Sequence, residues 1–298
     1  MPSSTPVLFR GLIDDAAVFP PGNAPLALAV DRHRAHRQAG YADCIGPLLI
    51  PASAATDLLG LLQSSAEGEV PLRIGVIGRP GTDPAVVWKA FDLLSQSPTV
   101  EVVGAELGWT ETLFESWPAG LPLAVEIPRG DTASTALSQI RVQRQSGHEL
   151  IAKFRTGPTS TWPWPDEVEL AHFIASTVAL DVPFKLTGGL HHAIRGTYPV
   201  ARTPEDNHGL LNILMATSKA VEGADPVELA DILGDRDAAN LADCFIRTAD
   251  DADYAHAIRR AFRAYGCCEV TDPIAELTAL DLLPLDHQPP DHLTKDAR

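Results

Sequence analysis

The chain has 298 residues, of which 45% are hydrophobic and 21% are charged, a composition typical of a globular enzyme and not of a disordered or fibrous protein. Its 23 Lys and Arg against 39 Asp and Glu give a formal net charge of −16, which argues against nucleic acid and anionic membrane surfaces as partners. The four cysteines show neither C-x-x-C spacing nor the density of a secreted disulfide scaffold, and no segment resembles a signal peptide or a membrane span. We therefore expect a cytoplasmic protein.

Short apolar runs alternate with longer amphipathic stretches along the chain, a pattern typical of repeated βα units around a parallel sheet. The predicted strands cover residues 7–15, 44–50, 72–78, 100–107, 121–127, 150–156, 183–188 and 265–270. Helical patterns between them cover residues 26–38, 55–64, 83–95, 132–145 and 166–180. This repeat predicts an α/β fold, a closed (β/α)8 TIM barrel.

The interval between the seventh and eighth strands is much longer than the others. Residues 190–264 are predicted to form a polar loop followed by helices at residues 209–221, 226–233, 238–248 and 252–264. We predict a single barrel domain over residues 1–285 with this helical insertion, followed by a flexible Pro-rich tail over residues 286–298.

An open doubly wound sheet is the structural alternative. Such a sheet usually carries a G-x-G-x-x-G or Walker motif after its first strand, and this sequence has Asp14-Asp15-Ala-Ala-Val there. The barrel is therefore preferred.

Two lysines lie inside predicted strands, where a solvated lysine is not expected. Residue alternation places Lys153 and Arg155 on one face of the sixth strand, and Lys185 and Thr187 on one face of the seventh. A buried lysine beside another cation is expected to have a lowered pKa, and its free amine can attack a carbonyl to form a Schiff base. The structural alternative is that both lysines only form buried ion pairs.

Carboxylates on other strands are candidates for proton transfer or cation binding. Glu106 on the fourth strand and Glu126 on the fifth each follow a small residue on the same face. Asp14 and Asp15 end the first strand on opposite faces, and alternation alone does not tell which of the two faces the barrel interior. Each of these acids could instead serve only as an ion-pair partner for the cations.

We expect the loops after the sixth and seventh strands to bind the substrate. The planar donor fork of Arg155 suits a carboxylate or phosphate, and glycine permits close approach of a ligand to the backbone. Trp162 and Trp164 could form an apolar wall above the site or pack locally. The further binding candidates are Thr187, Gly188, Gly189, His191, His192 and His208.

Three short segments resemble the deoxyribose-phosphate aldolases, which are class I aldolases on a (β/α)8 barrel. The segments are Lys153-Phe-Arg-Thr-Gly157, Lys185-Leu-Thr-Gly-Gly189 and Leu12-Ile-Asp14-Asp15-Ala-Ala-Val-Phe-Pro20. The resemblance implies that Lys153 forms the Schiff base, that Lys185 lowers its pKa, and that Asp14 belongs to the polar network.

The resemblance covers about a fifth of the chain and has clear departures. Arg155 replaces a small hydroxyl residue of the family, and the adjacent histidines His191 and His192 are foreign to it. Where the family has an aspartate on the fourth strand, this chain offers only Glu101 or Glu106.

The leading hypothesis is an aldolase-like lyase that acts on a small anionic carbonyl compound and needs no cofactor. Lys153 would be the nucleophile, Lys185 its activator, and Glu126 or Glu106 the proton shuttle. Isomerisation or dehydration through the same iminium would use the same residues.

Two other functions stay open at this point. A divalent-metal-dependent lyase, isomerase or hydrolase could use Glu106, Glu126, Asp15 and His191 as ligands. A non-catalytic barrel could bind small anions without turnover. The sequence specifies neither the substrate and pathway nor the oligomeric state, although a homo-oligomer is plausible for a barrel.

Overall fold

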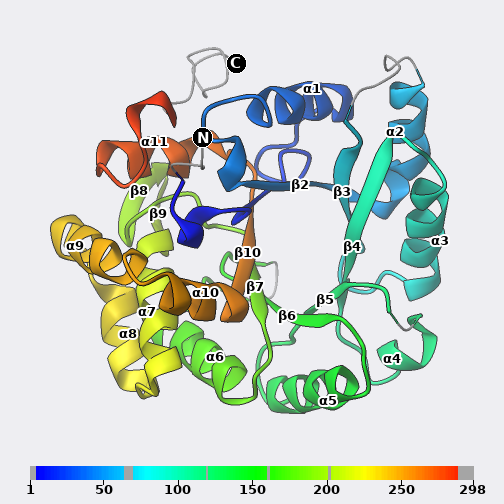
Figure 1. The fold of residues 1–298 in the computed structure, drawn as a ribbon. Coiled ribbons are helices and arrows are strands. Elements are labelled where there is room, and N and C mark those ends of the chain that lie inside the picture. Colours follow the sequence, from blue (N-terminus) through cyan, green and yellow to red (C-terminus); the bar gives the residue numbers. More distant parts are fainter. Residues whose placement is uncertain (1–4, 64–69, 119, 160–161, 201–202, 288–298) are drawn as a thin grey trace.

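The computed structural model describes residues 5–63, 70–118, 120–159, 162–200 and 203–287. In these residues eight parallel strands close a barrel in the order β1-β10-β7-β6-β5-β4-β3-β2, with helices packed around it (Figure 1). The predicted (β/α)8 TIM barrel is thus confirmed. The barrel strands are β1 (Ile13–Asp15), β2 (Ile45–Pro51), β3 (Leu72–Ile77), β4 (Val100–Gly108), β5 (Leu123–Glu126), β6 (Leu150–Arg155), β7 (Phe184–Thr187) and β10 (Phe262–Cys267).

Amphipathic helices follow the strands and cover the barrel. They are α1 (Leu26–His36), α2 (Ala55–Leu62), α3 (Pro84–Ser95), α4 (Leu113–Ser116), α5 (Ala133–Gln145), α6 (Glu167–Ala179) and α11 (Thr271–Ala279). Helix α3 shows why these segments are helical: Asp83 caps its first turn by accepting a hydrogen bond from the backbone of Ala85, and Pro84 occupies the first helical position. In the described ranges, no helix is both long and apolar enough to cross a membrane.

The aromatic packing outside the barrel fixes which strand residues point inward. Phe173 on α6 stacks on Phe154 of β6 with ring centroids 4.7 Å apart, and it meets Phe184 of β7 edge-on at 5.5 Å. Because neighbouring strand residues point to opposite faces, Lys153 and Lys185, next to these phenylalanines, point into the barrel.

The long interval between β7 and β10 is helical, as predicted. Its helices are α7 (Leu210–Glu222), α8 (Pro226–Gly234), α9 (Ala238–Ala249) and α10 (Ala252–Ala261). Where the sequence predicted only a polar loop, β8 (Gly196–Val200) and β9 (Thr203–Asn207) pair as an antiparallel hairpin.

Three predicted boundaries are wrong. Val7–Phe9 is a 3-10 helix and Gly11 has a φ of 56°, so the first strand begins only at Ile13. The eighth barrel strand begins at Phe262, which shortens the predicted helix before it, and ends at Cys267. The predicted flexible tail includes His287, yet this ring is buried and hydrogen-bonded to Thr5 at 3.0 Å; residues 288–298 lie outside the described residues.

Candidate active site

A row of side chains with alternating charge crosses the barrel interior, and we refer to it as the charge ladder. Its members are, in order, Asp14, Lys185, Glu106, Lys153, Glu126 and Arg155. The strand register assembles it, because Lys153 is paired with Lys185 on one neighbouring strand and with Glu126 on the other.

The inner half of the ladder is centred on Lys185. Its Nζ donates to Oδ2 of Asp14 at 2.6 Å and to Oε1 of Glu106 at 2.5 Å. The other oxygen of Glu106, Oε2, accepts from Nζ of Lys153 at 2.6 Å. Each of these four side chains is at most 6% exposed, so the ion pairs are shielded from water.

The outer half leads to the carboxyl ends of the strands. Lys153 Nζ donates to Oε2 of Glu126 at 3.0 Å, and Arg155 Nε donates to Oε1 of the same carboxylate at 3.2 Å. The Arg155 side chain is 33% exposed, whereas that of Lys153 is 5% exposed. The ladder therefore ends in a cation that a ligand can reach.

Burial and ion pairing set the proton affinities of the ladder. Burial opposes the charge of Glu106, but the ammonium groups of Lys153 and Lys185 outweigh it and lower the pKa of Glu106 to about 2. Burial likewise opposes the charge of Lys185, but Asp14 and Glu106 raise the pKa of this lysine above its ordinary value. For Asp14 burial prevails, and its pKa is raised.

The prediction that two neighbouring lysines lower each other's pKa is wrong for Lys185. The carboxylate of Glu106 lies between the two ammonium groups and contacts both. Burial lowers the pKa of Lys185, but attraction to the carboxylates of Asp14 and Glu106 outweighs it. The pKa of Glu126 is lowered in the same way: burial opposes its charge, and Lys153 and Arg155 more than compensate.

A cavity of about 790 Å³ opens at the carboxyl ends of the strands, above Lys153. Glu106, Glu126 and Lys153 line its inner part, and loops after five different strands form its rim. Its larger side chains toward the rim are those of Phe19, Arg79, Trp109, Arg129, Arg155, Trp162 and Thr187. Such a cavity, at this end of a barrel, has the size and place of a small-molecule site.

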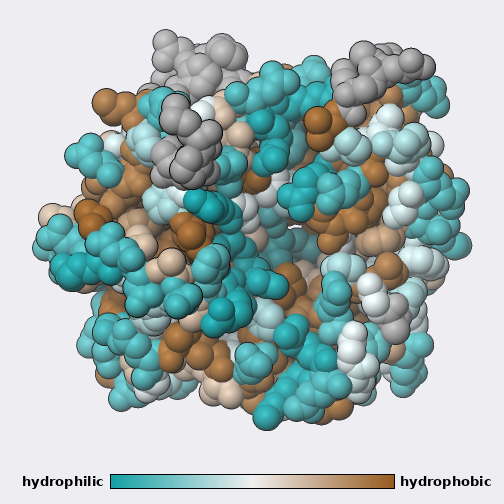
Figure 2. Space-filling model, in the orientation of Figure 1, coloured by the Kyte–Doolittle hydropathy of each residue, from teal (hydrophilic) through white to brown (hydrophobic). Residues whose placement is uncertain are grey.

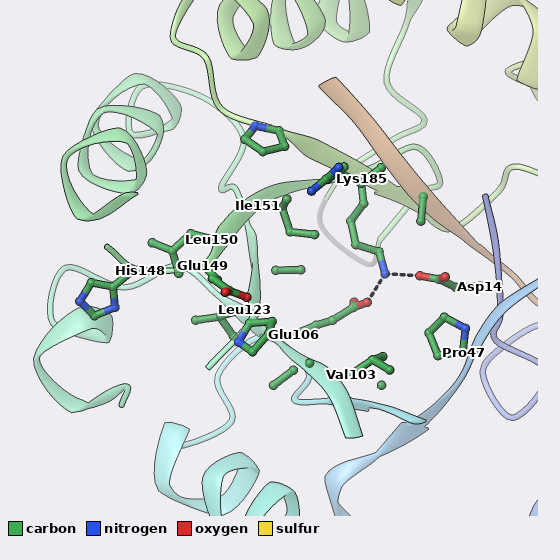
Figure 3. Close-up of a pocket in the computed structure, with 18 of the residues that line it drawn as sticks. Asp14, Pro47, Val103, Glu106, Leu123, His148, Glu149, Leu150, Ile151 and Lys185 are labelled. Atoms are coloured by element: carbon green, nitrogen blue, oxygen red, sulfur yellow. Dashed lines mark hydrogen bonds and ion pairs between the residues drawn. The ribbon is translucent and has the colours of Figure 1, made fainter. Parts of the chain in front are cut away.

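A second cavity, of about 590 Å³, lies at the amino ends of the strands on the other side of the ladder. Figure 3 shows Asp14, Glu106 and Lys185 pointing toward one another beside it, with Val103 and Ile151 among its walls. Figure 2 shows the end-on face of the barrel hollowed near its centre among hydrophilic side chains. Glu106 lines both cavities, so this carboxylate belongs to the partition between them.

The structure resolves which of the two adjacent aspartates faces the barrel. Asp14 points inward to Lys185, and Asp15 points outward, where its Oδ2 lies 3.0 Å from Nδ1 of His33 and its Oδ1 accepts from the backbone of Ala17. Asp15 and His33 are both buried behind the barrel wall. The question that residue alternation left open is thus decided in favour of Asp14, and Asp15 does not reach the barrel interior.

His191 and His192 do not line either cavity as described. The ring of His191 lies 3.6 Å from the sulfur of Cys267 and 3.7 Å from that of Cys268. His192 pairs with Glu276 at 2.6 Å on α11. Their contacts tie the loop after β7 to β10 and α11, so the structure gives no support to their predicted contact with substrate.

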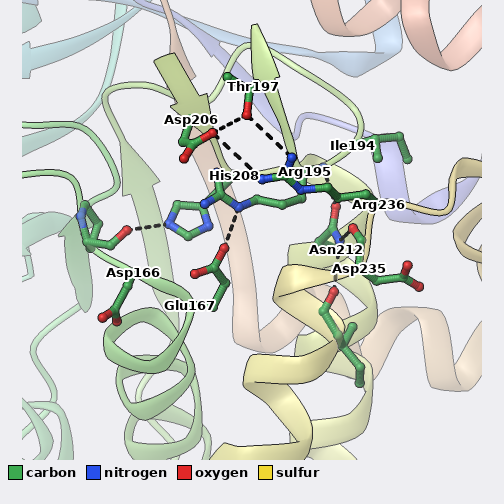
Figure 4. Close-up of polar contacts among 12 residues, drawn as sticks. Asp166, Glu167, Ile194, Arg195, Thr197, Asp206, His208, Asn212, Asp235 and Arg236 are labelled. Atoms are coloured by element: carbon green, nitrogen blue, oxygen red, sulfur yellow. Dashed lines mark hydrogen bonds and ion pairs between the residues drawn. The ribbon is translucent and has the colours of Figure 1, made fainter. Parts of the chain in front are cut away.

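His208 is buried in the polar cluster that joins the β8–β9 hairpin to α6 (Figure 4). Its Nε2 donates to the backbone carbonyl of Pro165 at 2.9 Å, and nearby Arg195 pairs with Glu167 at 2.5 Å. His208 is not among the described residues that line either cavity, and these contacts indicate a structural role for it.

Some of the predicted residues at the ends of β6 and β7 and in the loops after them line the cavity, and others pack against neighbouring residues. Thr187 and Trp162 line the cavity at the carboxyl ends. Gly188 and Gly189 have φ values of 74° and 73°, and a Cβ on Gly189 would lie 2.3 Å from the ring of Trp164. Gly189 is thus needed for packing against Trp164, and a direct ligand contact has no support.

The residues proposed for a metal site are not brought together. In the described part of the chain no group of three or more His, Cys, Asp or Glu side chains could hold a metal ion. Glu106 and Glu126 share the barrel interior, but Asp15 faces outward and His191 contacts the two cysteines.

Sequence reasoning did not identify Phe19, Arg79 and Trp109 as rim residues. The available signal was their position: Trp109 directly follows β4, Arg79 lies two residues after the end of β3, and Phe19 lies four residues after the end of β1.

Comparison with protein-family models, curated proteins and solved structures finds no significant match to this chain. The fold and the geometry of the cavity are therefore the basis for a functional assignment. A closed (β/α)8 barrel with a charged cavity at the carboxyl ends of its strands is consistent with an enzyme.

Proposed function

We propose that this barrel is a lyase that forms a Schiff base between Lys153 and the carbonyl of a small anionic substrate. The supporting observation is that a buried lysine, Lys153, is among the residues that line the cavity at the carboxyl ends of the strands, two residues from a partly exposed arginine on the same face. An amine beside an anion-binding group suits a substrate that carries both a carbonyl and a negative charge.

Lys153 must lose a proton before it can attack a carbonyl, and Glu126 is placed to take it. When the substrate's anionic group binds Arg155, the guanidinium is drawn away from the carboxylate that it contacts at 3.2 Å. Glu126 then loses one of the two cations that lower its pKa, and becomes a stronger base 3.0 Å from the Nζ of Lys153. Substrate binding and amine activation are coupled in this way.

The covalent steps need only these groups and the substrate. The amine adds to the carbonyl carbon, and Glu126 returns its proton to the carbinolamine oxygen. A second proton moves from the nitrogen to that oxygen, and water leaves to give the iminium. Glu126 then takes the proton from the hydroxyl of the departing fragment, the carbon–carbon bond breaks, and its electron pair moves into the iminium to form an enamine. Protonation of the enamine carbon by Glu126 and addition of water release the second product and restore Lys153.

The inner ladder acts through Glu106. Lys185 and Asp14 hold this carboxylate from one side, and its other oxygen orients the ammonium of Lys153 at 2.6 Å. Lys185 is thus a positioning residue in this mechanism, whereas the sequence predicted that it activates Lys153 directly.

Reductive trapping tests the proposal. The protein is incubated with a panel of aldehydes, ketones and 2-oxo acids in the presence of sodium cyanoborohydride, and its intact mass is measured. We expect one added substrate fragment per chain from at least one anionic member of the panel. Saturable binding of an anionic carbonyl compound without any adduct would contradict the lyase and favour a non-catalytic barrel.

A further inference from the structure

The geometry around Lys153 and Arg155 points to the class of substrate, and we propose a 2-oxo acid that carries a bulky planar apolar group, such as an aryl ring, and, as the cleavage step requires, a hydroxyl on the carbon two bonds from its carbonyl carbon. This inference rests on the proposed function for its covalent chemistry. The binding of the carboxylate and of the apolar group, however, does not depend on a Schiff base. Two separate features of the cavity support it, the span between the two cations and the aromatic rim.

The carboxylate of Glu126 lies between the amine of Lys153 and the guanidinium of Arg155, so it shows how far apart these two groups are. One of its oxygens lies 3.0 Å from Nζ of Lys153, and the other lies 3.2 Å from Nε of Arg155. The two cationic groups are therefore separated by the width of a single carboxyl group and its two hydrogen bonds.

A 2-oxo acid fits that span because its carboxylate is bonded directly to the carbonyl carbon. With the carboxylate on Arg155 in place of Glu126, the adjacent carbonyl lies within reach of Lys153. A carbonyl compound whose charge is several bonds away, such as a phosphate at the end of a chain, does not match this spacing.

The rim offers apolar surface to a ligand, although the guanidinium of Arg129 lies over the ring of Trp162, 5.1 Å from its centroid. Phe19 and Trp162 line the cavity, and in the described ranges neither ring packs against the hydrophobic core. Trp162 is 46% exposed, so a large part of its surface stays accessible to a ligand. Prolines in the loops after four strands fix the backbone of the same rim: Pro20, Pro80, Pro128 and Pro158.

The volume agrees with a substrate larger than a three-carbon acid. A cavity of about 790 Å³ has room for a ring as well as the 2-oxo acid group, and aromatic walls recognise planar apolar groups. The ring would extend from the carbonyl toward the rim while the charged end stays on Arg155.

Calorimetric binding of two hydroxy acids tests the recognition without the covalent step. Phenyllactate and lactate carry a hydroxyl in place of the carbonyl, so neither can form a Schiff base. We expect phenyllactate to bind about tenfold or more tightly than lactate, because the ring is buried against the rim. Trp162→Ala and Phe19→Ala should remove most of this preference and leave the affinity for lactate unchanged.

A matched pair of arginine variants tests the anionic end. Arg155 and Arg73 each donate from Nε to a glutamate, at 3.2 and 3.4 Å, but Arg73 lies away from the cavity. Arg155→Gln should weaken both hydroxy acids about tenfold or more, and Arg73→Gln should change neither by more than about twofold.

The outcomes separate this inference from the proposed function. Equal affinities for phenyllactate and lactate, or an unchanged preference in both aromatic variants, would overturn the substrate class. Tight binding of phenyllactate without a cyanoborohydride adduct of phenylpyruvate would support the recognition and overturn the Schiff base. Tighter binding of inorganic phosphate than of phenyllactate would overturn the 2-oxo acid.

Discussion

Lys153 and Lys185 lie in register on adjacent strands and donate to opposite oxygens of one carboxylate, that of Glu106. Without that carboxylate the barrel would hold two buried ammonium groups with a single acid each, Glu126 for one and Asp14 for the other. Glu106 is therefore the residue on which the whole charge ladder depends.

Glu106→Gln should strongly destabilise the protein. The substitution keeps the shape of the side chain but removes the charge that compensates two buried cations, and we expect a loss of about 3–5 kcal/mol in the free energy of unfolding. Urea denaturation measures it. Glu101→Gln on the same strand is the control, because Glu101 is 57% exposed and its ion pair with Arg73 contributes at most about 1 kcal/mol. Similar losses in the two variants would contradict the buried ladder.

Acid should destabilise the folded protein through Glu106. Folding lowers the pKa of this carboxyl from 4.5 to about 2, so its contribution is fully present above pH 4.5 and is lost as the pH falls toward 2. The contribution is on the order of 3 kcal/mol, and the raised pKa of Asp14 acts in the opposite direction over part of this range. Unfolding free energies measured between about pH 6 and about pH 3 should fall less steeply in Glu106→Gln than in the wild type. Parallel pH profiles would show that Glu106 is not the group responsible.

The two adjacent aspartates should behave differently. Asp15→Asn removes the charge that faces His33 outside the barrel, so we expect a loss of about 1–3 kcal/mol of stability and an unchanged rate of adduct formation per folded chain. Asp14→Asn leaves Lys185 with Glu106 as its remaining carboxylate and should slow adduct formation several-fold, because Glu106 is drawn away from Lys153. Rates of cyanoborohydride trapping, normalised by the folded fraction from circular dichroism, check both. A slower rate in Asp15→Asn alone would place the wrong aspartate in the site.

Gly46→Ala should disturb the inner end of the ladder. A Cβ at Gly46 would lie 2.1 Å from Oδ1 of Asp14, so the carboxylate must move away from Lys185, and we expect a loss of about 1–3 kcal/mol. Gly60 in α2 is the matched control, since a Cβ there meets no atom within 4 Å. Gly60→Ala should stabilise the protein by about 0.5–1 kcal/mol, as alanine favours a helix over glycine. Thermal or urea unfolding of the pair distinguishes a local clash from a general intolerance of substitution.

The barrel and the members of the ladder were accessible from the sequence because they follow from residue alternation. Phe154 and Phe184 are apolar neighbours of Lys153 and Lys185, and a strand that packs one face against helices must point the other into the barrel. The same rule brought Glu106, Glu126 and Arg155 to the barrel interior.

What alternation could not supply was contact between distant residues. Asp14 and Asp15 alternate correctly, but pairing of β1 with β2 and β10 decides which one points inward. The raised pKa of Lys185 depends on Asp14 and Glu106, which lie 171 and 79 residues earlier in the chain, and no local pattern shows these contacts. The β8–β9 hairpin was missed because Pro199 and Pro204 lower its strand propensity, and because, among the residues that the structure describes, its strands pair only with each other.

The most direct test of the central claim is to locate the trapped adduct by peptide mapping after cyanoborohydride treatment with phenylpyruvate. Lys153→Arg and Lys185→Arg form a matched pair, because arginine keeps the positive charge but cannot act as an amine nucleophile. We predict an adduct on Lys153 in the wild type, its loss in Lys153→Arg, and its retention on Lys153 in Lys185→Arg. An adduct on Lys185, or one that persists in folded Lys153→Arg, would contradict the assignment of Lys153 as the nucleophile.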